Sequence, residues 1–179
     1  IKLFNIEGIG KSPSKFDKIK LESVNTYYFK RLNNEQVLNI LSPAYKQNDS
    51  KKLLALIDLF KSRAENINDI EEGISYMQND GIERYSEEAL KIINSADKEI
   101  MLDTINELEK ISLWHASSIE KVIKSEIKKH NLKMFDIAAP IRASITGKTF
   151  SPSIFLVLEK LGKKVSIKRL KKILISVNE

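Results

Sequence analysis

The sequence predicts an all-α protein, and three observations support this fold class. Apolar residues recur at helical spacing along almost every segment after residue 16. Serine and aspartate, which commonly cap helices, stand in front of several of these segments. The alternation of apolar and polar residues that is typical of strands is missing over any useful length. We therefore expect packed helices and no sheet of consequence.

The first two helices are expected within residues 17–32 and 49–63. Asp17 is a candidate N-cap for "KIKLESVNTYYFKRL". In "DSKKLLALIDLFKSR" either Asp49 or Ser50 would cap a helix with one apolar face. That face is formed by Leu53, Leu54, Ile57 and Phe60.

Three further helices are expected between residues 86 and 131. Ser86 precedes two glutamates in "SEEALKIINSA", where the helix dipole favours acidic side chains. "DKEIMLDTINELEKI" follows with its own apolar stripe. In "SSIEKVIKSEIKKHN", Ser117 and Glu120 have the spacing of a capping box.

The last part of the chain has the most complete helix signature. In "SPSIFLVLEKLG", Ser151 is expected as the cap, Pro152 at the first helical position and Gly162 just past the end. "VSIKRLKKILISV" predicts the final helix. A polar break, "SADK", suggests two helical bundles. We expect a link over residues 1–31, a first bundle over 32–96 and a second over 97–179.

Composition excludes several classes of protein. The chain has 179 residues, of which 42% are hydrophobic and 30% charged, as in ordinary globular domains. It has no cysteine, so disulfides and thiolate chemistry are excluded, and its apolar runs are too short to cross a membrane. The net charge of +6 is uneven, because residues 32–109 are acidic and residues 110–179 strongly basic. A concentrated basic region attracts polyanions such as nucleic acid.

No catalytic or metal-binding residue is predicted. "GIGKS" resembles the end of a phosphate-binding loop, but Asn5 stands where that loop needs its first glycine. His115 and His130 have neither a cysteine nor a paired histidine near them, so we expect no metal site. No arrangement of serine, histidine and aspartate indicates nucleophilic catalysis, and Trp114 is expected to pack rather than to stack on a ligand.

The segment "APIRASITGKTFSPSIFLVLEKLG" is the best candidate for a binding site. It places Arg142 on a short helix, Gly147 in a loop, and a second helix after Ser151. A helix N-terminus offers free amides to anions, and arginine can pair with a base edge or stack on its face. Lys148 adds a positive charge in the loop. A purely structural role for Arg142 is an equal alternative at this point.

The same segment is similar to the C-terminal signature of bacterial glutamyl-tRNA synthetases, "PLRxALTGxxxSPxxFxxLxxLGK". The matching residues are Pro140, Arg142, Ala143, Thr146, Gly147, Ser151, Pro152, Phe155, Leu158, Leu161, Gly162 and Lys163. A second motif near the start, "GKSPSKFDKIKLESVNTYY", resembles the family's "xKSPAxFDxxKLxWxNxxY". It matches at Lys11, Ser12, Pro13, Phe16, Asp17, Lys20, Leu21, Asn25 and Tyr28, with Ser23 in place of tryptophan.

The resemblance implies the anticodon-binding, C-terminal part of a glutamate–tRNA ligase. Such an enzyme joins glutamate to tRNA-Glu with ATP and Mg²⁺, and it would be cytoplasmic and monomeric. This chain would lack the N-terminal catalytic domain, need no cofactor itself and be inactive alone. Residues 1–31 would be the link and stem-contact segment that follows the catalytic domain. The family's motif assigns anticodon contacts to Arg142, Ser151, Pro152 and Ile154, with Lys148 nearby. Arg63 would correspond to another anticodon-reading arginine.

Two further expectations accompany this interpretation. The basic C-terminal residues would steer the RNA backbone; these are Lys163, Lys164, Lys168, Arg169, Lys171 and Lys172. The alternatives are a freestanding helical adaptor that binds protein through its acidic middle region, and a regulatory RNA-binding module without aminoacylation.

Overall fold

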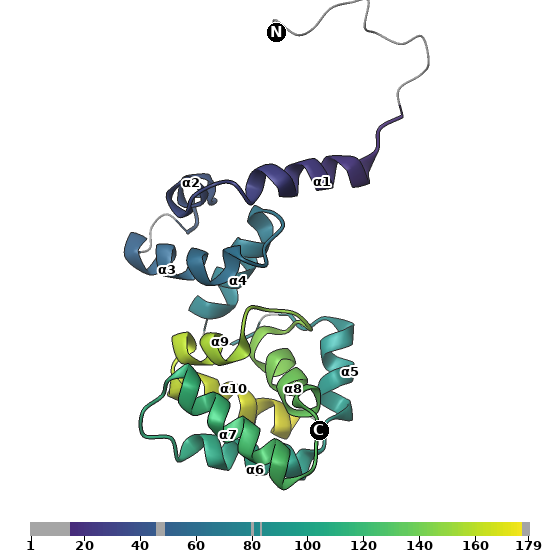
Figure 1. Cartoon of the computed structure of the whole chain (residues 1–179), viewed down its shortest axis with the longest axis vertical. Coiled ribbons are helices and arrows are strands. Elements are labelled where there is room, and N and C mark those ends of the chain that lie inside the picture. Colours follow the sequence, from purple (N-terminus) through teal and green to yellow (C-terminus); the bar gives the residue numbers. More distant parts are fainter. Residues whose placement is uncertain (1–14, 46–48, 80, 83, 177–179) are drawn as a thin grey trace, which may run out of the picture.

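The computed structural model contains only helices, turns and irregular connections in the part that it describes. The described residues are 15–45, 49–79, 81–82 and 84–176, with side chains described up to residue 171. The all-α prediction is confirmed for these residues (Figure 1). The helices are α1 (Lys18–Phe29), α2 (Asn34–Ile40), α3 (Ser50–Lys61), α4 (Ile67–Gln78), α5 (Glu87–Ser95), α6 (Lys98–Glu109), α7 (Ala116–Lys129), α8 (Met134–Thr146), α9 (Ile154–Leu161) and α10 (Lys163–Ser176).

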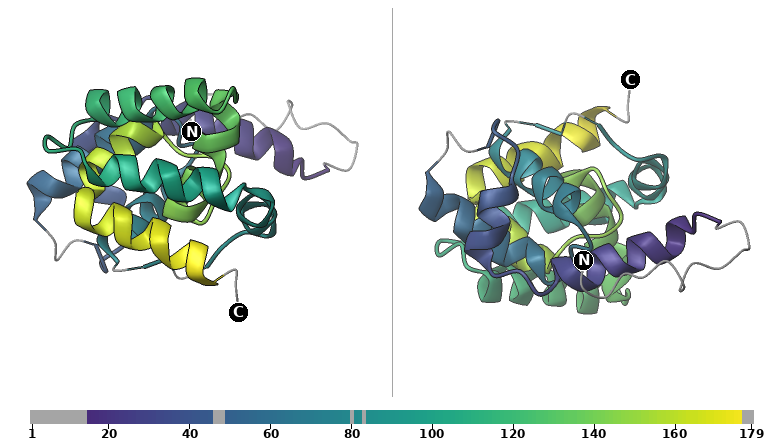
Figure 2. Two further views of the ribbon diagram at one scale, coloured as in Figure 1. Left: turned by 90° about the horizontal axis from the view of Figure 1, so that it is seen from below. Right: turned by 90° about the horizontal axis from the view of Figure 1, so that it is seen from above.

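Helices α2, α3 and α4 form a first group, to which only the end of α1 is attached. Phe29 is the buried residue of α1, and it joins Val37, Ile57 and Ile74 in one apolar cluster. The rest of α1 projects away from the other helices, as the two views of Figure 2 show. Its apolar side chains are therefore largely exposed, for example Ile19 at 79%.

Helices α5 to α10 form a second group with a larger apolar core. Most of this core comes from α6 to α10 and includes Ile105, Ile123, Ile141 and Val157. Helix α5 packs on α8 through a small cluster around Ala89. The expected division after residue 96 stays a prediction, but the packing of α5 onto α8 favours a division between α4 and α5.

Several predicted caps are present. The carboxylates of Asp17 and Asp49 accept hydrogen bonds from the backbone amides at the starts of α1 and α3. The Ser86 hydroxyl accepts one from the amide of Ala89 in α5. Gly162 follows the last residue of α9, as expected. These helices begin and end where local side-chain chemistry predicts.

Two predicted helix starts are wrong. Helix α9 begins at Ile154 after Ser153, not after Ser151, because the Ser151 hydroxyl is bonded elsewhere. Helix α7 begins at Ala116, and Ser117 does not cap it. The carboxylate of Glu159, from α9, accepts the hydrogen bond of the Ala116 amide at 2.7 Å. A side chain from another helix thus takes the place of the expected local cap.

Among the described helices, none is long and apolar enough to cross a membrane. The first five residues of the opening motif, residues 10–14, lie outside the described residues, and they include the matches at Lys11, Ser12 and Pro13.

Candidate nucleic-acid interface

A groove lies between the two helical groups, and we refer to it as the interface groove. Its first wall comes from the end of α3 and from α4, with Arg63, Glu72 and Tyr76. Its second wall is the loop between α8 and α9, with Lys148, Ser151 and Pro152. Residues more than 80 positions apart in the sequence therefore share one surface.

The packing of two aromatic rings shapes the first wall. Phe60 and Tyr76 meet edge to face with their ring centroids 5.5 Å apart. Gly73 lies beside them, where an added Cβ would come within 2.7 Å of the Phe60 ring. Only glycine lets α4 approach Phe60 this closely, so this residue fixes the position of the wall.

Arg142 stands on α8 and is tied to the second wall. Its Nε donates a hydrogen bond to the Ser151 Oγ at 3.1 Å, and that hydroxyl donates to the carbonyl of Pro152 at 2.8 Å. Partial burial lowers the pKa of Arg142 from its ordinary value, and the neighbouring charge of Arg63 lowers it further. An arginine nevertheless remains charged in proteins, so the site holds two neighbouring cations.

Neither Arg63 nor Arg142 forms an ion pair with a carboxylate of the described residues. Arg63 is also exposed. The carboxylates of Asp69 and Glu72 also line the groove, but neither is paired with Arg63 or Arg142. Two neighbouring guanidinium groups without an ion-pair partner favour an anion or a group rich in hydrogen-bond acceptors. The electrostatics of the groove thus suit a polyanionic ligand with exposed acceptors.

Lys148 spans the groove by forming an ion pair with Glu72 of α4. The loop that carries Lys148 is tied to the end of α8 by Thr146, whose hydroxyl accepts a hydrogen bond from the Lys148 amide at 3.1 Å and donates to the Arg142 carbonyl at 2.9 Å. Gly147 has a φ of 73°, and an added Cβ would lie 2.6 Å from a backbone oxygen of residue 84. Both the backbone conformation and the lack of space require glycine here.

The structure brings together most of the predicted site residues. Arg63, Lys148, Ser151 and Pro152 line the groove, and Arg142 is bonded to Ser151. Ile154 is different, because it is only 2% exposed and packs in the core of the second group. Ile154 therefore packs inside the second helical group and has almost no surface to offer a ligand.

Sequence reasoning missed several residues of the groove, among them Glu72 and Phe150. The acidic character of residues 32–109 gives no sign that Glu72 pairs with Lys148 across the groove. Phe150 lines the groove and leaves 62% of its surface exposed. An aromatic residue inside the polar loop "TGKTFSP" was the available signal for Phe150.

The expected basic steering surface of α10 is smaller than its sequence indicates. Arg169 is 4% exposed, so its assignment to this surface is wrong. Its guanidinium donates to the backbone carbonyls of Ile145 and Asn79. Lys171 pairs with Glu109. Lys164 and Lys168 are exposed, whereas the Lys172 side chain lies outside the described residues.

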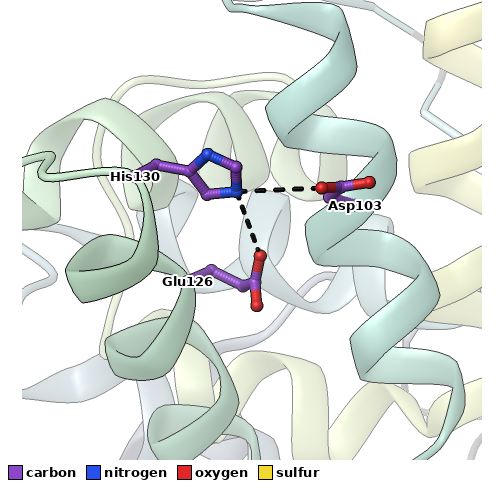
Figure 3. A group of neighbouring side chains, drawn as sticks. All are labelled: Asp103, Glu126 and His130. Atoms are coloured by element: carbon purple, nitrogen blue, oxygen red, sulfur yellow. Dashed lines mark ion pairs between the residues drawn. The ribbon is translucent and has the colours of Figure 1, made fainter.

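A second cluster of charged side chains joins α6 to α7 (Figure 3), and none of its residues lines the interface groove. The Nε2 of His130 lies 3.4 Å from a carboxylate oxygen of Glu126 and 3.8 Å from one of Asp103. The Lys129 ammonium lies 3.0 Å and 3.2 Å from the same two carboxylates, and these hydrogen bonds raise the pKa of Lys129. Because Lys129 already supplies a cation to both carboxylates, we interpret the cluster as an ion-pair network between helices.

Comparison with known protein families gives a match over most of the chain. The model described as "Anticodon binding domain" matches residues 26–174. The chain belongs to this family. The match extends over both helical groups and includes the walls of the interface groove on each side.

Curated relatives of this anticodon-binding domain are similar over nearly its whole length. "Glutamate--tRNA ligase 2" of Rickettsia felis is 38% identical over 96% of this chain, and "Glutamate--tRNA ligase 2" of Parvibaculum lavamentivorans is 32% identical over 96%. The chain spans only 38% and 36% of these two proteins.

A solved structure shares the fold of the domain. A glutamate tRNA ligase from Elizabethkingia meningosepticum superimposes with a TM-score of 0.72 at 22% identity. The superposition covers 97% of this chain and 35% of the solved one.

Proposed function

We propose that this domain is the anticodon-binding part of a glutamate–tRNA ligase and that the interface groove receives the anticodon loop of tRNA-Glu. The observation that carries the proposal is the meeting of Arg63, Arg142 and Lys148 around one groove. The relatives named as glutamate–tRNA ligases support the choice of tRNA.

The chemistry of the groove fits the unpaired bases of a loop. Such bases are recognised through their hydrogen-bonding edges and their flat faces, by arginines, backbone groups and aromatic rings. Arg142 has an Nε that is already bonded to Ser151, so the outer nitrogens of its guanidinium are the groups that would meet a base edge. Arg63 is exposed and would meet either a neighbouring base or a phosphate.

The remaining chemistry of the ligase would belong to the rest of the protein. We propose that a catalytic part outside these 179 residues binds ATP, Mg²⁺ and glutamate, and that the enzyme works as a cytoplasmic monomer. This domain would contribute affinity for the correct tRNA and its orientation, not a reacting group.

The experiment is a titration of the chain with a fluorescently labelled anticodon stem-loop of tRNA-Glu. A stem-loop of the same length with a scrambled loop is the control, and both are measured at low and moderate salt. We expect a preference for the correct loop that persists at the higher salt, because base contacts release few counterions. Equal and strongly salt-dependent binding of both loops would reduce the function to a basic surface and refute the proposal.

Arg142→Ala is expected to weaken binding of the correct loop by about 1–3 kcal/mol. Arg31→Ala is the control for loss of an arginine outside the groove, since Arg31 lies just after α1 with its guanidinium 3.5 Å from the centroid of the Tyr27 ring. Circular dichroism checks that both variants keep their helices. Unchanged affinity of a folded Arg142→Ala variant would contradict the role of this arginine.

A further inference from the structure

We propose that Phe150 is a stacking platform for one unpaired base of the bound RNA. The inference rests on the proposed function and adds a contact that the sequence motif does not include. Stacking on an aromatic face tolerates any base, so Phe150 would add affinity for an open loop while the arginines select its bases.

The position of Phe150 is the first argument. Its two following neighbours, Ser151 and Pro152, are buried, whereas Phe150 is 62% exposed. Its ring lines the same groove as Arg63 and Lys148. Phe150 therefore offers an uncovered aromatic face beside cationic groups, which is the surface on which an unpaired base stacks.

The rigidity of the loop is the second argument. The Thr146 hydroxyl bonds to the Arg142 carbonyl and accepts a hydrogen bond from the Lys148 amide at 3.1 Å. Ser151 is fixed by Arg142 on the other side of Phe150. The backbone on both sides of the ring is therefore held before any ligand binds, which lowers the entropy cost of stacking.

The nearby charge is the third argument. The ammonium of Lys148 lies 5.8 Å from the centroid of the Phe150 ring. A nucleotide whose base stacks on this ring has its phosphates within reach of the Lys148 side chain. The ion-pair partner of Lys148, Glu72, is exposed, so a phosphate can compete with it for the ammonium. Ring, ammonium and guanidinium groups together match the face, the phosphate and the edge of a single nucleotide.

The test compares substitutions that separate aromatic stacking from apolar volume. Phe150→Ala and Phe150→Leu are expected to weaken binding of the anticodon stem-loop about 5- to 150-fold, the range for loss of one stacked base. Phe150→Tyr and Phe150→Trp are expected to bind like the unchanged protein. Phe135→Ala is the matched control, because Phe135 is 67% exposed on α8 but lies in a different hollow.

A fluorescence measurement gives a readout that a merely structural role would not change. In Phe150→Trp, a new indole at the groove is added to Trp114, which is partly buried and donates to the Leu158 carbonyl. Stacking of a base on the new indole quenches its emission. We expect RNA to quench this variant strongly and the unchanged protein weakly.

The outcomes separate the two proposals. If the unchanged protein does not prefer the correct loop, the proposed function fails, and the stacking role fails with it when Phe150→Ala and Phe150→Leu bind both loops normally. If it does prefer that loop and Arg142→Ala weakens binding, while Phe150→Ala and Phe150→Leu bind normally, only the stacking role is overturned. Loss of binding in Phe150→Ala with full retention in Phe150→Leu would also overturn it, since apolar volume alone would then suffice.

Discussion

Replacing Arg169 by methionine tests how the two helical groups are held together. Arg169 lies on α10, and its guanidinium donates at 3.0 Å to the Ile145 carbonyl in α8 and at 2.6 Å to the Asn79 carbonyl that follows α4. Methionine has similar length and fills most of the volume but cannot donate. The substitution therefore leaves two carbonyls without these donors and keeps most of the packing.

The magnitude follows from those two hydrogen bonds. Each bond from a charged donor contributes about 1.5–3 kcal/mol, so two give about 3–6 kcal/mol. The Asn79 carbonyl is only partly buried, and water can replace one donor there, which favours the lower half of the range. We expect a loss of about 3–4 kcal/mol in the free energy of unfolding, a large share of the typical total of about 5–15 kcal/mol.

Urea denaturation followed by circular dichroism measures this loss. Lys168→Met is the control, since Lys168 is the preceding residue of α10 and is exposed; it is expected to change the unfolding free energy by less than about 0.5 kcal/mol. A loss below about 1 kcal/mol for Arg169→Met would show that these hydrogen bonds do not hold α10 against α4 and α8.

Three further changes test the groove and its walls. Glu72→Gln removes the negative charge that pairs with Lys148, which leaves the ammonium free to attract RNA. We expect RNA binding to tighten about 2- to 5-fold at low salt and to change little at high salt, and weaker binding would contradict this expectation. Gly73→Ala forces a Cβ to within 2.7 Å of the buried Phe60 ring. We expect the midpoint of thermal or urea unfolding to fall by an amount that corresponds to about 1–3 kcal/mol of lost stability, and an unchanged midpoint would refute the close approach. Burial raises the pKa of Tyr76 above its ordinary value of 10.0, so the unfolded chain releases this proton first and the unfolding free energy falls as pH rises above that value. Tyr76→Phe should flatten that fall, and an identical pH profile in both proteins would contradict it.

Much of the fold follows from the sequence because most of its signals are local. The caps at Asp17, Asp49 and Ser86 act on amides within three residues, so the pattern alone predicts them. The sequence does not predict that α5 belongs to the second helical group. The polar break after α5 resembles a domain boundary, but the apolar face of α5 packs on α8, some 50 residues further along the chain. Long-range packing of this kind leaves no local signal.

The candidate site follows from the sequence only in part. The motif brings Arg142, Ser151 and Pro152 to attention, and the structure places them beside the groove. It also suggests Ile154, whose burial depends on where α9 begins. The Lys148–Glu72 pair joins residues 76 positions apart, which no spacing argument predicts.

The Glu159 carboxylate at the start of α7 has a consequence for the order of folding. The Ala116 amide receives its partner from a residue 43 positions later, so the first turn of α7 lacks its cap until α9 has docked. A chain that stops before Glu159 would fray at this turn, and Glu159→Gln should weaken the cap by removing its charge. The start of α7 and the docking of α9 would then form together, so a change that loosens α9 should also fray the first turn of α7.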